Sequence, residues 1–184
     1  MYHERQTGNL CAIHALNNII QRKEFNEEYF DQVANQINIL GKTFDIEDGE
    51  EEGGDYNIST IIAALQNRNF SIDQASEIVI ERAVQQNTLE PGRYLIGNGY
   101  HWIGLRRFSK NGLLWNFDSL LPEPIEVTSL EDILSKRNKR GQRVGEWNNL
   151  YRITDNNENQ NESQVSSSSI VSHLLPPSKK VIIF

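Results

Sequence analysis

Three residue types that together perform nucleophilic catalysis occur far apart in this chain: a cysteine, a mid-chain histidine and an aspartate. Cys11 is the single cysteine of 184 residues, so it forms no internal disulfide. A cysteine nucleophile needs a base that takes its proton, and the base needs a polar group that orients it. His101 and Asp118 are the candidates for these two roles. Their joint occurrence favours thiol chemistry over the alternative, in which Cys11 is a small buried hydrophobic residue.

Cys11 stands at the predicted start of a helix. Apolar residues recur at helical spacing from Leu10 to about Arg22, and Asn9, which follows a turn-forming glycine, is the expected N-cap. Cys11 then occupies the second helical position. There the unpaired backbone N–H groups and the positive end of the helix macrodipole favour thiolate over thiol.

His101 is the preferred base among four histidines. His14 lies three residues after Cys11 on the same helix face, which leaves little room for a substrate carbonyl between them. We therefore expect a packing or supporting role for His14. His3 has no pattern around it and is expected at the surface, and His173 lies at the edge of a low-complexity stretch. His101 follows a flexible, glycine-containing approach and opens a predicted strand.

The strand that begins at His101 is predicted to form a hairpin with the strand that ends at Asp118. Residues 109–112, Ser-Lys-Asn-Gly, are a hairpin signal. If residues 108–111 form the loop, His101 and Asp118 face each other, and a register slipped by two residues keeps both on one face of the sheet. Asp118 then holds the imidazole in the tautomer that leaves one nitrogen facing the thiol. Asn116 shares this face and is the alternative orienting group. Taken alone, Asp118 also fits an exposed strand end.

The order of the remaining elements predicts the fold class. Helical spacing predicts further helices over residues 25–40, 57–67, 76–86 and 129–138. Strands are predicted over residues 70–72, 93–97, 101–108, 113–118, 150–153 and 180–184. Helices come first and strands later, which indicates an α+β fold rather than alternating βαβ units.

The chain length fits a single domain over residues 1–184. Within it, the acidic, glycine-rich stretch 41–55 is predicted to be a mobile loop. The Asn/Gln/Ser-rich stretch of about 154–172 buries too little apolar area to offset its ordering entropy and is predicted to be a disordered insert. Because the last five residues are apolar, we expect the insert to be a loop that leads into a closing strand.

Composition and charge exclude several classes of protein. The net charge of −7 argues against nucleic-acid binding, and the basic run over residues 136–143 is expected to be a solvated surface. No apolar run approaches the roughly 20 residues of a membrane span. One cysteine and no spaced histidine cluster argue against a metal site, and we expect no cofactor. The N-terminus does not resemble a signal peptide, and a single cysteine fits a reducing compartment, so we expect the protein in the cytoplasm, the nucleus or both. We also expect a monomer.

Several separated motifs, in order along the chain, resemble the Josephin-domain deubiquitinases. They are Tyr2-His3-Glu4-Arg5-Gln6, Gly8, Leu10-Cys11-Ala12, His14, Leu16-Asn17-Asn18, Gly54-Asp55-Tyr56-Asn57, His101-Trp102 and Trp115-Asn116-Phe117-Asp118-Ser119-Leu120. The resemblance runs from the N-terminus to about Leu121. It implies a papain-like cysteine protease fold, in which an N-terminal helical part with a helical arm packs on an antiparallel sheet.

The resemblance also implies an activity, namely cleavage of isopeptide bonds at the C-terminus of ubiquitin, with ubiquitin and ubiquitinated proteins as partners. Cys11 matches the nucleophile, His101 the general base and Asp118 the third member of the triad. Gln6 matches the residue that donates to the oxyanion hole together with the backbone N–H of Cys11, and an amide suits this role because it donates without titrating. Ile58 is a candidate contact for ubiquitin. The alternatives are a catalytically weak ubiquitin-binding module and a papain-like hydrolase that acts on another acyl substrate.

Overall fold

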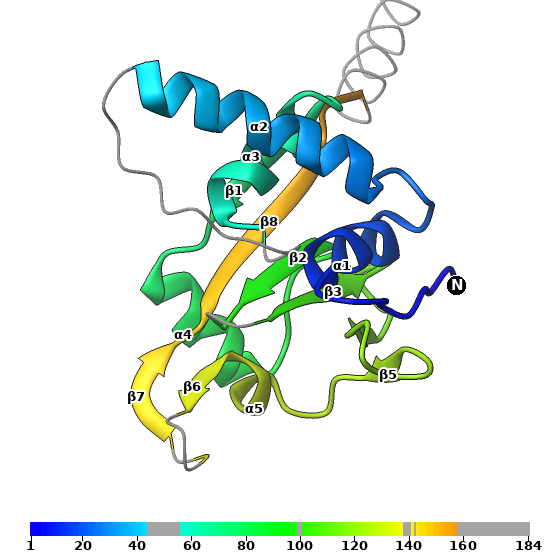
Figure 1. The fold of residues 1–184 in the computed structure, drawn as a ribbon. Helices are drawn as coiled ribbons and strands as arrows, with labels where there is room; N and C mark the ends of the chain where they lie inside the picture. The colour runs from blue at the N-terminus through cyan, green and yellow to red at the C-terminus, as the bar shows by residue number, and fades with distance from the viewer. Residues whose placement is uncertain (44–55, 99–100, 138–140, 142, 158–184) are drawn as a thin grey trace, which may run out of the picture. The chain divides into compact units, whose positions relative to one another are not determined.

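The helices precede most of the strands, as the sequence predicts (Figure 1). The computed structural model describes residues 1–43, 56–98, 101–137, 141 and 143–157. The chain divides into two units, Met1–Thr154 and Asp155–Phe184. The helices are α1 (Cys11–Ile20), α2 (Glu27–Thr43), α3 (Ile58–Gln66), α4 (Glu77–Gln86) and α5 (Leu130–Leu134). The strands are β1 (Phe70–Gln74), β2 (Gly92–Gly97), β3 (Trp102–Arg107), β4 (Leu114–Phe117), β5 (Ile125–Glu126), β6 (Ser135–Arg137), β7 (Arg143–Trp147) and β8 (Asn149–Asp155).

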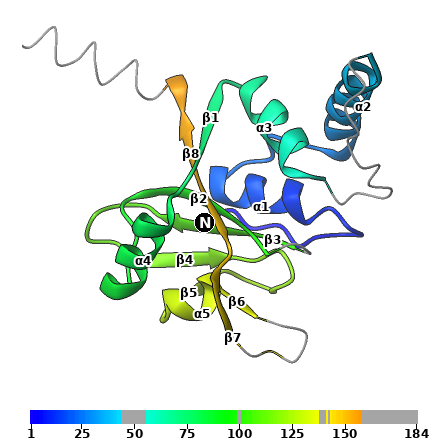
Figure 2. The same ribbon diagram turned by 90° about the vertical axis from the view of Figure 1, so that its left-hand side faces the viewer.

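A six-stranded sheet forms the centre of the first unit, with the strand order β1-β8-β2-β3-β4-β5 (Figure 2). Strand β2 pairs with both β3 and β8 in antiparallel fashion, and β4 pairs antiparallel with both β3 and β5. The predicted α+β class is therefore confirmed. Strands β6 and β7 form a separate antiparallel pair.

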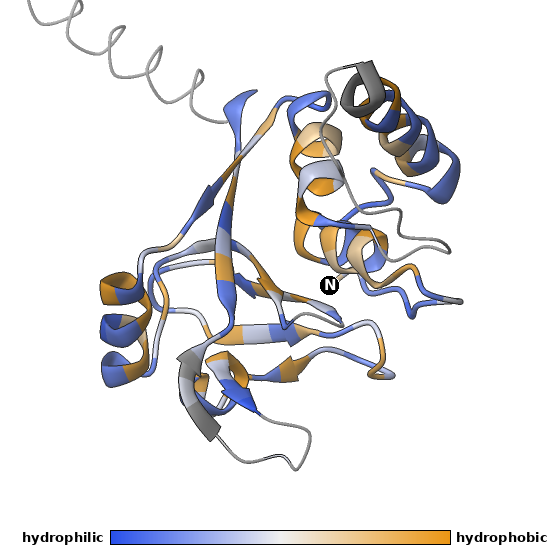
Figure 3. Cartoon of the chain, turned by 60° about the vertical axis from the view of Figure 1, so that its left-hand side comes forward, coloured by the Kyte–Doolittle hydropathy of each residue, from blue (hydrophilic) through white to orange (hydrophobic). Residues whose placement is uncertain are grey.

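Each face of the sheet carries its own hydrophobic core. In β2, Leu95 packs with the core that contains α1 and α3, whereas its neighbours Tyr94 and Ile96 pack with the core that contains α4 and α5. This alternation follows from the period of two of a strand. The two cores place the sheet between α1 and α3 on one side and α4 and α5 on the other. Figure 3 shows that α3 is largely hydrophobic, whereas α2 carries many hydrophilic positions.

Helix α1, which begins with Cys11, packs directly against β3 at a glycine. A Cβ atom added to Gly104 would lie 2.5 Å from Cγ2 of Ile19 and 3.0 Å from the carbonyl oxygen of Ala15. Both atoms belong to α1, so only glycine allows the helix to approach the strand this closely. Since β3 directly follows His101, this contact fixes the helix of Cys11 against the strand of His101.

The region after β5 differs from the prediction. The single helix expected over residues 129–138 is wrong: α5 ends at Leu134, and Ser135–Arg137 form strand β6. Ser129 does cap α5, since its side chain accepts a hydrogen bond from the Asp132 N–H at 3.2 Å. Pairing with β7 accounts for the change from helix to strand, and such a partner is not visible in a local pattern.

Parts of the predicted loops lie outside the described residues. Helix α2 continues through Thr43, so the first three residues of the stretch 41–55 are helical, and residues 44–55 lie outside the description. Residues 154 and 155 belong to β8, whereas residues 158–172 of the predicted insert and the predicted closing strand 180–184 also lie outside it. Among the described residues, no helix is both long and apolar enough to span a membrane.

Candidate active site

Cys11 is the first residue of α1, and the sequence prediction of its helical position is corrected by one residue. The N-cap is Leu10, not Asn9, because the chain turns at Gly8 with a φ of +64° and the Leu10 carbonyl accepts from the His14 N–H at 3.1 Å. A leucine side chain offers no acceptor to the first-turn N–H groups, which asparagine would have supplied. The N–H groups at the start of α1 therefore receive no side-chain cap.

His101 and Asp118 lie in direct contact. Nε2 of His101 is 2.8 Å from Oδ1 of Asp118, and both side chains are largely buried. Since an ionised carboxylate only accepts, Nε2 carries the proton and donates it. The side chain of Cys11 lies at the same imidazole, where it contributes to the raised pKa of His101. The structure therefore brings the predicted pair His101 and Asp118 into contact, and the role of Asp118 in orienting the imidazole stays a prediction.

The contact is made although the two residues are not cross-strand partners. Gly104 pairs with Phe117 and Leu105 with Asn116, so the register is slipped by two residues from the one in which 101 faces 118. Asn116, the alternative orienting group, instead accepts the Asp118 N–H on its side-chain oxygen at 2.9 Å. Asn116 therefore holds the backbone of Asp118, and Asp118 contacts the histidine.

Hydrogen bonding sets the charge state of both groups. The hydrogen bond with Asp118, and after it the one with Cys11, raise the pKa of His101 to about 9, although burial opposes the shift. Burial raises the pKa of Asp118, but hydrogen bonds from His101 and from the Leu120 N–H outweigh it, so the net pKa lies below the usual value. At neutral pH the pair is an imidazolium and a carboxylate.

Gln6 lies against the residue that follows Asp118. The Gln6 N–H donates to the carbonyl oxygen of Ser119 at 3.0 Å, and the Ser119 hydroxyl donates to Oε1 of Gln6 at 2.9 Å. Nε2 of Gln6 donates to the Gly8 carbonyl at 3.2 Å. These contacts fix which end of the amide is the donor. Ser119 is almost fully buried, and the sequence analysis did not single it out because a serine after a strand has no distinctive local pattern.

His14 contacts a different acid. Its Nδ1 donates to Oε1 of Glu4 at 2.8 Å, so its ring is engaged on the N-terminal segment. The sequence analysis expected a supporting role for His14 but did not identify Glu4 as its partner. Both residues belong to the Josephin-like opening motif, which was the available clue. Among the described residues, no group of three or more histidine, cysteine, aspartate or glutamate side chains is arranged to hold a metal ion.

The described geometry supports nucleophilic chemistry. A sulfur at a helix start, a histidine in contact with it and a buried carboxylate behind the histidine are the parts of an acyl-transfer site. Comparisons with known proteins agree with this class. The Josephin family model matches residues 6–145.

Individual relatives match at moderate identity. The chain is 27% identical to Josephin-2 of Homo sapiens over 146 residues, which covers 67% of this chain and 71% of the relative. It is 29% identical over 143 residues to a Josephin-like protein of Drosophila melanogaster, with 67% of this chain and 61% of the relative covered. The Ataxin-3 homolog of Arabidopsis thaliana is also 29% identical over 143 residues, which cover 49% of its length.

The chain belongs to the Josephin family, since the family model covers more than half of it. The α+β architecture with an antiparallel sheet agrees with the papain-like fold of this family, so the predicted fold is confirmed. Josephin proteins are generally cysteine-type deubiquitinases. Membership therefore supports a hydrolase function of this type and an interaction with ubiquitin.

Proposed function

We propose that this chain is a thiol-dependent deubiquitinase that hydrolyses peptide and isopeptide bonds at the C-terminus of ubiquitin. In this proposal Cys11 is the nucleophile, His101 the general acid and base, and Asp118 the group that orients His101. Gln6 and the backbone N–H of Cys11 form the oxyanion hole. The contact of His101 with both Asp118 and Cys11 is the single observation that carries the proposal.

Acylation begins with the thiolate of Cys11. An adjacent imidazolium favours the thiolate form of a cysteine, and the pKa of His101, at about 9, keeps the imidazolium protonated at neutral pH. The sulfur attacks the carbonyl carbon of the ubiquitin C-terminal glycine. Because Nε2 of His101 donates to Asp118, Nδ1 is the nitrogen that gives its proton to the leaving lysine amine.

Deacylation uses the same groups in the reverse sense. The now neutral Nδ1 of His101 takes a proton from water, the hydroxide oxygen attacks the thioester, and the sulfur leaves as thiolate while the proton stays on the imidazole. In both steps the carbonyl oxygen becomes negatively charged. The Gln6 amide stabilises this charge without titrating, and the N–H at the start of α1 adds a second donor.

Hydrolysis of a ubiquitin–lysine isopeptide conjugate tests the proposal. We expect turnover by the wild type, none by Cys11→Ala and none by His101→Ala, with all three proteins folded. Competition with related modifier proteins separates a ubiquitin enzyme from a papain-like hydrolase of another acyl substrate. Turnover that persists in Cys11→Ala, or that another modifier supports better than ubiquitin, contradicts the proposal.

One observation favours a second candidate, a catalytically weak ubiquitin-binding module. The Cys11 side chain is only 4% exposed, which limits the access of a substrate carbonyl to the sulfur. Binding of ubiquitin without hydrolysis of its conjugates supports this candidate. The presence of the complete Cys-His-Asp set counts against it, because binding alone does not require these three residues in contact.

A further inference from the structure

The N-terminal segment, residues 2–6, joins the helix of Cys11 to the turn after Asp118. On the α1 side, the Tyr2 N–H donates to Oε1 of Gln21 at 2.9 Å, and Nε2 of Gln21 donates to the Tyr2 carbonyl at 3.0 Å. On the other side, Nε2 of His3 donates to the Leu121 carbonyl at 3.0 Å. Gln6 pairs with Ser119 as described above. The segment therefore bridges the two parts of the chain that supply the site.

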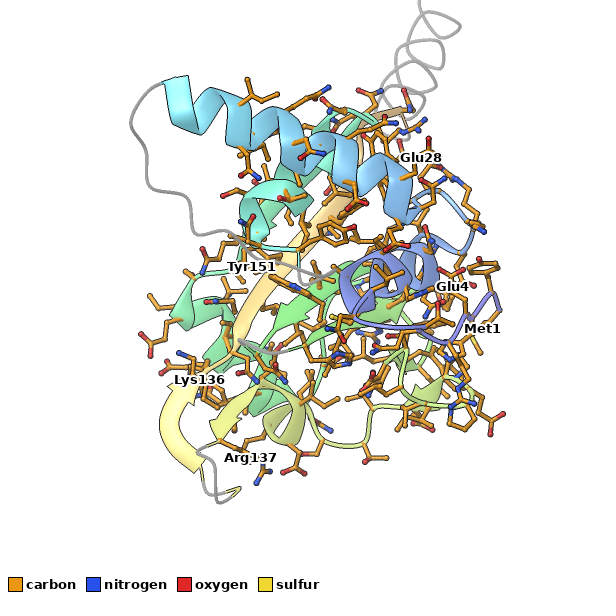
Figure 4. The ribbon with its side chains drawn as sticks, in the orientation of Figure 1. Met1, Glu4, Glu28, Lys136, Arg137 and Tyr151 are labelled. Carbon is orange, nitrogen blue, oxygen red and sulfur yellow. The ribbon has the colours of Figure 1, made fainter. Side chains whose placement is uncertain are left out.

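Glu4, in the middle of this segment, lies beside α1 (Figure 4). Its carboxylate accepts three hydrogen bonds, from His14 at 2.8 Å, from Nδ2 of Asn17 at 2.7 Å and from the Tyr2 hydroxyl at 2.6 Å. The side chain of Asn18 also binds the Glu4 backbone, accepting its N–H at 2.6 Å and donating to its carbonyl at 3.0 Å. Three of these partners belong to α1, the helix that begins with Cys11.

Burial makes this network costly to break. Asn17 and Asn18 are 1% and 0% exposed, so a lost partner would leave a desolvated amide. Burial raises the pKa of Glu4. The hydrogen bonds from Tyr2, Asn17 and His14 lower it by more, so the net pKa is below the usual value. The carboxylate is therefore ionised at neutral pH, the state in which it accepts from all three partners.

Gln6 follows two residues after this anchor. Its amide is oriented by two contacts, the Ser119 hydroxyl on Oε1 and the Gly8 carbonyl on Nε2. Both contacts depend on where the backbone of the segment lies. Between Gln6 and α1 the chain turns at Gly8, which has a φ of +64° and cannot by itself hold the segment in place. On the α1 side, the contacts of Glu4 with His14, Asn17 and Asn18 hold the segment two residues before Gln6.

We propose that Glu4 is a positioning residue for the oxyanion side of the site: by fixing residues 2–6 to α1, it sets the place of the Gln6 amide relative to Cys11. The proposal rests on the proposed function for the role of Gln6. The geometry of the anchor itself does not depend on the substrate.

Steady-state kinetics on a ubiquitin–lysine conjugate, combined with alkylation of Cys11 by iodoacetamide, tests this role. Alkylation needs the thiolate but no oxyanion hole. We expect Glu4→Ala to lower kcat by about 10- to 100-fold, the range of a small misplacement in a site, with KM and the alkylation rate close to wild type. Glu4→Gln should restore most of kcat, because the amide oxygen still accepts from Asn17. Arg5→Ala, an exposed neighbour in the same segment, is the matched control and should have no effect.

A double-mutant cycle shows whether Glu4 acts through Gln6. If it does, Glu4→Ala costs little further kcat in a protein that already carries Gln6→Ala. Additive losses would overturn the proposal. A fall in the alkylation rate equal to the fall in kcat would do the same, because it would indicate a general structural defect. Should Glu4→Ala fail to fold, Tyr2→Phe is used in its place, since it removes one of the three hydrogen bonds to the Glu4 carboxylate. We then expect a smaller fall in kcat, again with KM and the alkylation rate close to wild type.

A readout without substrate separates this proposal from the proposed function. Hydrogen exchange of the backbone N–H of Gln6, which donates to the Ser119 carbonyl, should become at least about tenfold faster in Glu4→Ala and stay unchanged in Arg5→Ala. The Leu105 amide in the central sheet should keep its protection. If the wild type hydrolyses no conjugate, the proposed function fails while the exchange data still decide the role of Glu4. Unchanged Gln6 exchange in Glu4→Ala overturns the role.

Discussion

Nε2 of His101 lies 2.8 Å from Oδ1 of Asp118, although the register of β3 and β4 does not pair the two residues. His101 immediately precedes β3, and Asp118 immediately follows β4. The contact therefore joins the residue just before β3 to the residue just after β4. It is stabilised locally by Asn116, which accepts the Asp118 N–H, and by the Leu120 N–H, which donates to Oδ1 at 3.0 Å.

Asp118→Ala should change both the rate and the pH profile of hydrolysis. The negative charge of Asp118 stabilises the imidazolium, so its removal lowers the pKa of His101 from about 9 and moves the basic limb of the kcat/KM profile to lower pH. We expect kcat at pH 7 to fall by about 100-fold, within the range of acid–base contributions. The pH dependence of kcat and of kcat/KM on an isopeptide substrate measures both effects.

Asp118→Asn is the matched control for this variant. Its side-chain oxygen still accepts from Nε2 of His101 but carries no charge, so its limb should lie between those of wild type and Asp118→Ala. A basic limb that stays in place in Asp118→Ala would contradict the role of Asp118 as the group that sets the charge of His101.

The wild-type pH profile should depend on the leaving group. Below pH 9 the imidazolium of His101 can protonate a departing lysine amine, and above pH 9 this proton is lost. We therefore expect kcat/KM on an isopeptide bond to fall above pH 9. A ubiquitin thioester, whose thiolate leaves without a proton, should show a weaker fall in acylation rate. Identical basic limbs for the two substrates would argue against proton donation by His101.

Gly104→Ala should separate α1 from β3. The new Cβ atom would meet Ile19 and the Ala15 carbonyl, and overpacking of this kind costs about 1–3 kcal/mol of unfolding free energy. Because α1 begins with Cys11, kcat should fall as well. Urea denaturation and kinetics check the two effects. In an Ile19→Ala background the added cost of Gly104→Ala should be smaller, and full additivity would show that the helix does not touch the strand here.

Tyr56→Phe should affect mainly stability, whereas Trp102→Phe should affect catalysis. The Tyr56 hydroxyl donates to Asp31 of α2 at 2.7 Å, whereas the Tyr56 carbonyl accepts from Nε1 of Trp102, the neighbour of His101, at 3.1 Å. Tyr56→Phe removes only the first bond and should lower the free energy of unfolding by about 1 kcal/mol with kcat preserved.

Trp102→Phe removes the bond beside His101 and should lower kcat. Thermal unfolding and turnover of the two variants, measured in parallel, provide the comparison. A loss of kcat in Tyr56→Phe as large as in Trp102→Phe would contradict this separation.

The sequence was sufficient to predict the central elements because their patterns are local. The apolar spacing after Asn9 predicted α1 to within two residues, and Asn57, the observed N-cap of α3, stood at the predicted helix start. The pairing of His101 with Asp118 was also predicted, because the candidate register and one slipped by two residues keep both side chains on one face. The Josephin resemblance placed Gln6 in the same set.

Features that depend on distant partners were not predicted. Strand β6 exists because Ser135 and Arg137 pair with Trp147 and Arg143 of β7, and no local alternation marks it. The position of Leu10 as N-cap follows from the turn at Gly8 rather than from the capping preference of Asn9. The contact between Glu4 and α1 joins residues 10 to 14 positions apart; the opening motif contains both Glu4 and its partner His14, but no local pattern indicates that they meet.

Reaction with ubiquitin that carries an electrophile at its C-terminus tests the proposed nucleophile most directly. The wild type and Cys11→Ala are incubated with the probe in parallel, and mass spectrometry of the digested adduct locates the modified residue. We expect one ubiquitin per chain, attached at Cys11, and no adduct with a folded Cys11→Ala protein. An adduct that persists in Cys11→Ala, or a folded wild type that is not labelled, would contradict the assignment of Cys11 as the nucleophile of a deubiquitinase.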